Sequence, residues 1–159
     1  MAKNNEKTNV MRILDQKRVV YKSYCYVDTN AISGMDVASV LNENSSQVFK
    51  TIVTVGNSKN HYVFLVPVNK ELNLKKAATA VGEKNVEMVK AKDLLALTGY
   101  IHGGCSPIGM KKQYKTVIDI SANNYDNIIF SGGKIGYQVE LTLEDLKKVI
   151  SFTLASITD

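Results

Sequence analysis

The middle of the chain carries two β-strand patterns separated by a short turn-forming segment, and this pair constrains the fold most. Residues 47–55 and 61–68 are rich in β-branched and aromatic side chains, and the segment Gly56-Asn57-Ser58-Lys59-Asn60 between them favours a loop. Runs of this kind that follow each other so closely pair as antiparallel neighbours. The sequence therefore predicts a β-hairpin over residues 47–68.

Helix and strand patterns surround this hairpin on both sides. Two of the helical patterns stop at Gly82 and Gly99, and glycine commonly terminates a helix. We expect helices over residues 9–14 (capped by Thr8 or Asn9), 36–42, 73–81, 92–98 and 142–150, and further strands over 19–27, 116–120, 128–131 and 137–141. This order lacks the regular β-α-β alternation of a doubly wound fold. It predicts an α+β protein with a strongly curved mixed sheet.

The length and composition indicate one globular domain over residues 1–159. The chain is 45% hydrophobic and 22% charged, and it contains no repeat and no Pro/Ser-rich linker. Apolar stretches such as Val63–Val66 are far shorter than the roughly 20 residues that span a bilayer. The N-terminal residues 1–9 lack the apolar core of a signal peptide. We therefore expect a cytoplasmic protein with no membrane partner.

An excess of basic residues favours an anionic partner without naming one. Twenty Lys and Arg against 15 Asp and Glu give a net charge of +5. Eighteen of these 20 cations are lysine, which suits loose contact with phosphates better than bidentate reading of bases. Nucleic acid is one such partner, although many lysine-rich proteins are basic without binding it. Cys25 and Cys105 form no CxxC pair and are expected to be free thiols.

Lys50 is the first candidate for chemistry. Alternation along a strand places it on one face with Val48 and Ile52, so its ammonium rises from a largely apolar surface. Because desolvating an amine is costly, such a lysine must meet an anion, reach the rim of the surface or lose its proton. The alternative is a lysine on an edge strand that discourages aggregation of the sheet. Both interpretations stay open on this evidence.

The second candidate is the segment Gly103-Gly104-Cys105-Ser106-Pro107-Ile108-Gly109. Glycines let backbone N–H groups approach a ligand, and successive amides in a turn can bind an oxyanion or a phosphate. Met110 stands where a phosphate-binding P-loop requires lysine, so the segment is not a P-loop. A ligand-binding loop is favoured over a plain surface loop. A second glycine-rich turn, Ser131–Gly136, more often serves as a hairpin connection.

Other candidate groups are weaker. His102 and Cys105 could act as a base and a thiol nucleophile, but such pairs are defined by spatial geometry rather than by spacing in a loop. The histidines and cysteines lack the paired spacing of a zinc site, so we expect no metal and no cofactor. Three tyrosines of the first strand could stack on a base or pack at the edge of a core: Tyr21, Tyr24 and Tyr26.

Five segments in chain order carry a resemblance to a known family. They are Gln47–Thr51, Leu74–Ala77, Gly99–Lys112, Ser131–Lys134 and Val139–Leu141. Together they resemble the YbaK/EbsC family of stand-alone aminoacyl-tRNA editing domains, the Cys-tRNA(Pro) deacylases. The resemblance covers nearly the whole chain.

The resemblance implies a fold, an activity and a set of site residues. The fold would be a curved mixed sheet of about six strands that approaches a barrel and is surrounded by helices. The activity would be removal of cysteine from mischarged Cys-tRNA(Pro) beside prolyl-tRNA synthetase, by attack of the substrate's own thiol on its ester carbonyl. Lys50 would be the catalytic residue, because the strand lysine is essential in the family. The residues expected to contact substrate are Gly103, Gly104, Ser106, Pro107, Thr51, Ser131 and Gly132.

The chain departs from the family pattern at three positions. Cys25 stands where members commonly have a functional tyrosine, Gln138 replaces a late aspartate of some members, and Cys105 replaces an aliphatic residue. The first two departures keep other functions open, whereas the third indicates that the Cys105 thiol packs or lines a pocket and is not the nucleophile. The alternatives are a catalytically silent module that binds tRNA or a synthetase, an Ala-tRNA(Pro) deacylase of the same superfamily, and a hydrolase that uses Cys105 and His102.

Overall fold

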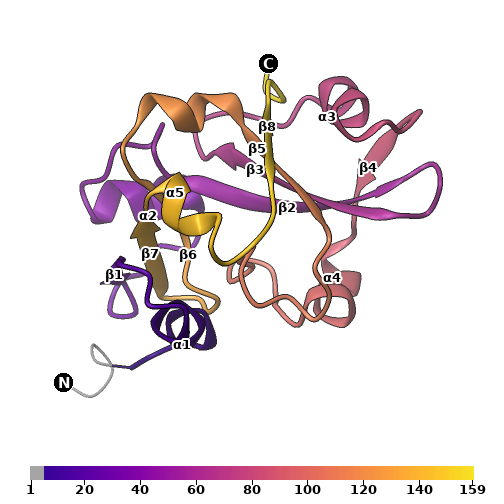
Figure 1. The fold of residues 1–159 in the computed structure, drawn as a ribbon. Coiled ribbons are helices and arrows are strands. Elements are labelled where there is room, and N and C mark those ends of the chain that lie inside the picture. Colours follow the sequence, from indigo (N-terminus) through magenta and orange to yellow (C-terminus); the bar gives the residue numbers. More distant parts are fainter. Residues whose placement is uncertain (1–5) are drawn as a thin grey trace.

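In the computed structural model, which describes residues 6–159, the strands form two sheets with helices around them (Figure 1). One sheet has the strand order β4-β2-β3-β5-β8 and the other β1-β7-β6. The strands are β1 (Lys22–Cys25), β2 (Phe49–Gly56), β3 (His61–Pro67), β4 (Val86–Met88), β5 (Lys115–Asp119), β6 (Ile128–Ser131), β7 (Tyr137–Leu141) and β8 (Thr153–Ala155). The helices are α1 (Asn9–Gln16), α2 (Gly34–Val40), α3 (Leu74–Val81), α4 (Ala91–Thr98), α5 (Leu143–Leu146) and the 3-10 helix η2 (Ile120–Asn124).

The expected hairpin is the centre of the larger sheet. β2 and β3 pair antiparallel in a register that sets Lys50 opposite Val66, whereas β3, β5 and β8 run parallel to one another. A parallel bridge between Val48 and Ile129 connects the start of β2 with β6 of the smaller sheet. The α+β class and the curved mixed sheet are confirmed. Six of the strands have four or more residues, and β4 and β8, with three residues each, extend the edges of the larger sheet.

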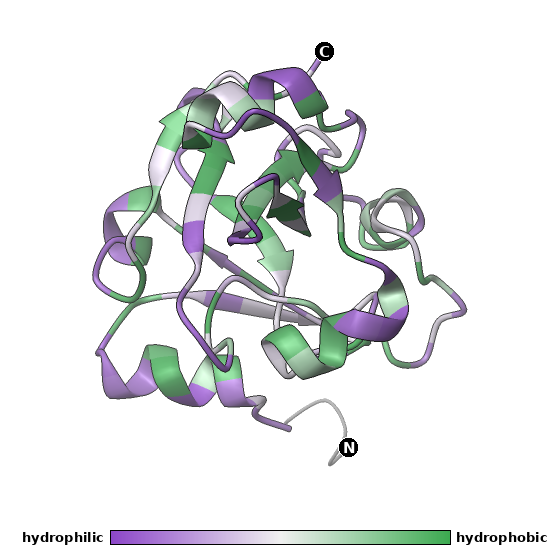
Figure 2. Ribbon diagram, turned by 90° about the vertical axis from the view of Figure 1, so that its right-hand side faces the viewer, coloured by the Kyte–Doolittle hydropathy of each residue, from purple (hydrophilic) through white to green (hydrophobic). Residues whose placement is uncertain are grey.

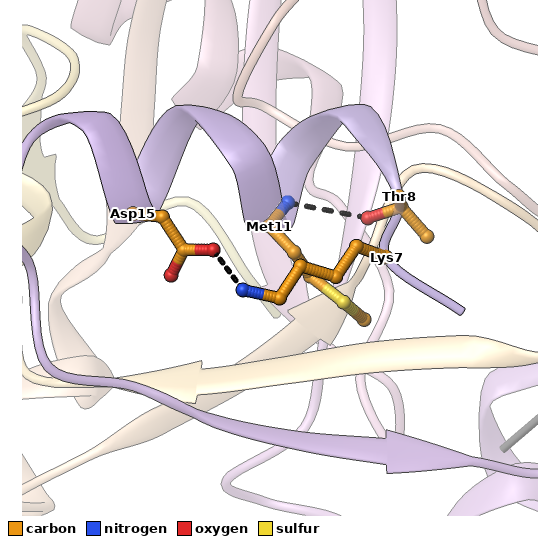
Figure 3. A network of polar contacts seen from close by, with 4 residues as sticks. All are labelled: Lys7, Thr8, Met11 and Asp15. Atoms are coloured by element: carbon orange, nitrogen blue, oxygen red, sulfur yellow. Dashed lines mark hydrogen bonds and ion pairs between the residues drawn. The ribbon is translucent and has the colours of Figure 1, made fainter. Parts of the chain in front are cut away.

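Local side chains and glycines form the helix ends. Asn73 accepts a hydrogen bond from the amide of Lys76 at the start of α3, and Gly82 ends that helix with φ of 72°. At α1 the hydroxyl of Thr8 accepts from the amide of Met11 at 3.2 Å, while Lys7 pairs with Asp15 along the helix (Figure 3). Local sequence therefore determines where these two helices begin.

β2 separates two parts of the hydrophobic core. Phe49 and Val53 face the main cluster, which also contains Phe130 of the smaller sheet, and Ile52 on the other face packs against the cluster under α3. The strands are largely hydrophobic, while the helices at the periphery carry both kinds of residue (Figure 2). No helix within residues 6–159 is long and apolar enough to cross a membrane.

Some element boundaries differ from the prediction. The first strand covers only Lys22–Cys25 of the expected 19–27, and α5 ends at Leu146 instead of continuing to Ile150. The strand β4 and the strand β8 were not predicted. Both have three residues, and they are strands because a neighbour lies beside them: β4 pairs with the end of β2, and β8 pairs with β5.

Candidate functional site

A pocket of about 580 Å³ lies where the two sheets meet. It collects side chains from segments that are far apart in the sequence. β2, the loop after α4, β6 and β7 contribute Lys50, Thr51, His102, Gly103, Cys105, Ser131 and Gln138. Its remaining walls are largely apolar and include Phe49, Phe130 and Leu94, with the start of α2 at one side. An apolar pocket with a few polar groups is the usual form of a small-ligand site.

Lys50 lies in the wall of this pocket, flanked by Val48 and Ile52 on the same strand face. Its side chain is one-third exposed, and its Nζ lies 3.3 Å from Oε2 of the exposed Glu71. The amine therefore both approaches the rim and meets an anion. β4 pairs with β2 only at Thr54–Gly56, so beside Lys50 the strand pairs with β3 alone, and the interpretation of this lysine as a guard against sheet aggregation stays open.

Thr51 lies in the same wall. Its Oγ1 is buried and has no hydrogen-bond partner among the described residues. A buried hydroxyl without a partner is unfavourable and rare, because nearly all buried polar groups are satisfied. Other atoms of Thr51 line the pocket, while its Oγ1 is closed off from it.

The glycine-rich loop divides into residues that line the pocket and residues that hold the loop. Gly103, which has φ of 90°, lines the pocket. Gly104 does not. A Cβ on Gly104 would lie 3.1 Å from the backbone nitrogen of Ile135, and its own amide donates to the carbonyl of Ile101. Gly104 therefore packs the loop against the second glycine-rich turn, and its amide is not available to an oxyanion.

The serine and the proline of the loop are buried. Ser106 is 0% exposed, and its Oγ accepts from the amide of Ile108 at 3.3 Å. Pro107 is buried beside it. The Tyr100 hydroxyl donates to the carbonyl of Ile108 and closes the base of the loop. Ser106 and Pro107 thus shape the loop in this structure and do not line the pocket.

The second glycine-rich turn shows the same division. Ser131 lines the pocket, and its Oγ accepts from the amide of Gly133 at 3.1 Å. Gly132 is buried, and its amide donates to the carbonyl of Tyr137 at 2.9 Å. The turn is a hairpin connection between β6 and β7, as its sequence indicated, and one of its residues also reaches the pocket.

The chemistry of the cysteines does not favour a thiol nucleophile. Cys105 is 7% exposed, and burial raises the pKa of its thiol to about 11. Since the thiolate is the reactive form, this cysteine is poorly suited to attack an ester. Cys25 pairs in register with Tyr137 in the smaller sheet and packs against the main core. Within residues 6–159, no three His, Cys, Asp or Glu side chains gather as a metal site would require.

Glu43 is the residue of this region that the sequence did not indicate, whereas Tyr26 was named there as a candidate for base stacking and Gln138 as a departure from the family pattern. Tyr26, which is 6% exposed, lines the pocket in place of the neighbouring Cys25. Gln138 also lines it, and in the amide orientation that satisfies both side chains its nitrogen donates to both carboxylate oxygens of Glu43. Burial raises the pKa of Glu43 to about 7, the hydrogen bond from Gln138 opposes this shift, and repulsion from Glu140 adds to it. No local pattern marks Glu43, because it meets β7 only in the folded chain.

Comparison with known proteins identifies similar chains. The family model of the aminoacyl-tRNA editing domain matches residues 30–149. A protein of Enterococcus faecalis, the proposed Cys-tRNA(Pro)/Cys-tRNA(Cys) deacylase EbsC, is 46% identical over 157 residues, which are 98% of this chain and 96% of that protein. The proline–tRNA ligase of Brachyspira hyodysenteriae is 26% identical over 132 residues, which are 82% of this chain and 23% of the ligase.

A solved structure has the same fold. The crystal structure of a proposed trans-editing enzyme for prolyl-tRNA synthetase superposes with a TM-score of 0.80. The match covers 97% of this chain and 99% of the other, at 20% sequence identity. At this identity the likeness concerns the arrangement of helices and strands.

Proposed function

This chain belongs to the family of aminoacyl-tRNA editing domains, and from that premise we propose that it is a trans-editing deacylase that removes cysteine from mischarged Cys-tRNA(Pro). One observation on this chain itself supports the proposal, in addition to its membership of the family. Lys50, Thr51 and Gly103 line a single pocket, although about 50 residues separate the strand from the loop. Such a pocket suits an ester that carries phosphate on one side and a small side chain on the other.

The proposal includes the biological setting. The substrate is mischarged tRNA, and the partner is prolyl-tRNA synthetase, the class of enzyme in which a similar domain occurs. Residues 1–159 act as one editing domain in the cytoplasm, where aminoacyl-tRNA is made and used. No cofactor takes part in the reaction.

The reaction uses the substrate's own sulfur. The cysteine thiolate attacks the ester carbonyl carbon, and the carbonyl oxygen becomes an oxyanion. Its collapse breaks the bond to the ribose oxygen, which takes up a proton and leaves as free tRNA. The other product is cysteine thiolactone, and water hydrolyses it to cysteine. The high thiol pKa of Cys105 supports a path without a protein nucleophile.

The chain contributes position and charge to this reaction. The Lys50 ammonium exchanges the exposed Glu71 carboxylate for the phosphate of the terminal nucleotide. The backbone at Gly103 approaches the oxyanion, and Thr51 shapes the pocket wall beside Lys50. These contacts hold the thiol and the carbonyl carbon in attack geometry, which is a large part of the rate that an enzyme of this kind supplies.

Cleavage of charged tRNA by purified protein tests the proposal. We expect kcat/KM for Cys-tRNA(Pro) to fall at least about 100-fold in Lys50→Ala, because positioning and oxyanion stabilisation are each worth that much. The matched control is Cys105→Ala, which lines the same pocket and should retain activity within about threefold. Loss in Cys105→Ala with activity retained in Lys50→Ala would contradict the proposal and support the thiol hydrolase.

Substrate comparison decides between the remaining alternatives. Cys-, Ala- and Pro-charged tRNA(Pro) and Cys-tRNA(Cys) are assayed under the same conditions. Preference for alanine assigns the chain to the alanine-removing branch, since alanine has no thiol to attack its own ester. Binding of tRNA without turnover of any ester identifies a silent binding module.

A further inference from the structure

The smaller sheet contributes to the pocket wall the side-chain amide of Gln138, which has no role in the proposed reaction. Gln138 lies on β7, lines the pocket and is 4% exposed. With its Nε2 turned toward Glu43, the amide donates to Oε2 at 2.7 Å and to Oε1 at 3.2 Å. Since the amide nitrogen is held by the carboxylate, the carbonyl oxygen of Gln138 faces the other way and can accept from donors there.

Backbone geometry fixes Glu43 in this place. Asn42 adopts a left-handed conformation with φ of 56° directly after the last residues of α2. The amide of Glu43 then donates to the carbonyl of Ala38 at 2.8 Å, and the amide of Asn42 donates to the carbonyl of Ser39 at 3.1 Å. This pair of bonds is the Schellman motif, which reverses the chain at a helix end. The end of α2 therefore positions the Glu43 carboxylate beside β7.

Among the described residues, the charged group that interacts electrostatically with Glu43 is also negative. Glu140 lies on the same strand as Gln138 and repels Glu43, and its own carboxylate already accepts from the Tyr24 hydroxyl and from Asn127. No lysine or arginine of residues 6–159 forms an ion pair with Glu43. Burial without a cation raises the pKa of Glu43 to about 7. This end of the pocket therefore lacks a positive charge.

An aminoacyl ester carries two charges of opposite sign. Its terminal phosphate is negative and matches Lys50 on the larger sheet, while its α-ammonium group is positive. We propose that Gln138 binds the α-ammonium group of the aminoacyl ester through its amide oxygen, and that Glu43 is a positioning residue that orients this amide and supplies the compensating negative charge. This assignment rests on the proposed function, since it names the part of the substrate that meets the smaller sheet.

A substrate without the ammonium group tests the assignment. Purified protein is assayed with Cys-tRNA(Pro) and with 3-mercaptopropionyl-tRNA(Pro), which keeps the thiol and the ester but has no amine. We expect Glu43→Gln and Gln138→Leu to lower kcat/KM for Cys-tRNA(Pro) about tenfold, mainly through KM, and to change kcat/KM for the mercaptopropionyl ester less than about twofold. Glu43→Asp should recover part of the loss. Glu87→Gln removes an exposed carboxylate on β4 and should change neither substrate.

The outcomes separate this assignment from the proposed function. Equal losses on both esters would show that Glu43 acts only through folding, and no loss on either ester would show that it contributes nothing; each result overturns the assignment. If the wild-type chain cleaves neither ester, the proposed function fails. The role of Gln138 and Glu43 is then tested by the affinity of the protein for uncleavable acylated RNA. Acceptor-end RNA hairpins with amide-linked cysteine or amide-linked 3-mercaptopropionate are titrated for this purpose. Equal affinity for the two hairpins overturns the assignment, whereas tighter binding of the cysteinyl hairpin that is lost in Glu43→Gln supports it.

Discussion

Single residues show how strongly the surroundings set the chemistry of a side chain. Two thiols, two loop hydroxyls and a strand lysine were the chemistry-bearing groups visible in the sequence. Burial makes the thiol of Cys105 a poor nucleophile, and it makes the carboxyl of Glu43 a weak acid. Partial exposure lets Lys50 keep a carboxylate partner at the pocket rim. The same residue types would behave differently on an open surface.

The raised pKa of Glu43 predicts a dependence of stability on pH. A carboxyl whose pKa is higher in the folded state favours folding while it is protonated, and this contribution is lost as the pH rises through about 7. A shift of this size corresponds to at most about 3 kcal/mol, and partial contact with water reduces it to about 1 to 2 kcal/mol. The melting temperature of Glu43→Gln relative to the wild type should therefore rise between pH 5 and pH 8. A difference that stays constant over this range would contradict the prediction.

At the scale of elements, the two glycine-rich turns work as one unit. The loop after α4 packs against the turn between β6 and β7, and α1 covers both. A Cβ on Gly133 would lie 2.6 Å from Val10, and a Cβ on Gly109 would lie 3.0 Å from Ile13. The close contact of backbone with backbone at Gly104 places Gly103 and Ser131 in the walls of the same pocket.

Gly104→Ala tests this packing. The added methyl would meet the backbone of Ile135 at 3.1 Å, so the two turns must separate by a few tenths of an ångström. We expect a loss of about 1 to 2 kcal/mol in stability, as for other overpacked sites, and a loss of deacylation of about tenfold. Gly82→Ala is the matched control, because its φ of 72° strains alanine while nothing lies within 4 Å of the new Cβ. It should lose about 1 kcal/mol and keep its activity; equal activity losses in the two variants would refute the role of Gly104.

At the scale of the whole molecule, each of the two sheets contributes different residues to the pocket. The larger sheet supplies Lys50 and Thr51, the smaller sheet supplies Ser131 and Gln138, and the bridge from Val48 to Ile129 holds the sheets together at the pocket. At about 580 Å³ the pocket can hold only a small part of a tRNA. The body of a tRNA must therefore meet the lysine-rich surface, whose net charge is only +5.

This charge predicts weak tRNA binding that depends on salt. Contact with about three phosphates gives a drop in affinity of roughly 20- to 40-fold between 50 and 200 mM salt, because each neutralised phosphate releases condensed counterions. Titration of uncharged tRNA(Pro) across this range measures the slope. Nanomolar affinity that stays flat with salt would contradict the prediction and indicate binding through apolar or base contacts.

The sequence by itself determined the local features of this protein. The β2–β3 hairpin, the cap at Thr8 and the glycine at the end of α3 follow from backbone preferences and from side chains a few residues apart. Alternation along β2 also places Lys50 among apolar neighbours. These features depend on short stretches of chain, so the order of residues is enough to predict them.

Tertiary structure alone decided which residues meet in the site. Glu43 reaches Gln138 across 95 positions of the sequence, and Gly104 faces the second turn instead of the pocket. The strands β4 and β8 exist because neighbours pair with them. Burial, electrostatic repulsion and pairing between distant segments arise only when those segments pack together, and for this reason no pattern in the sequence could have predicted them.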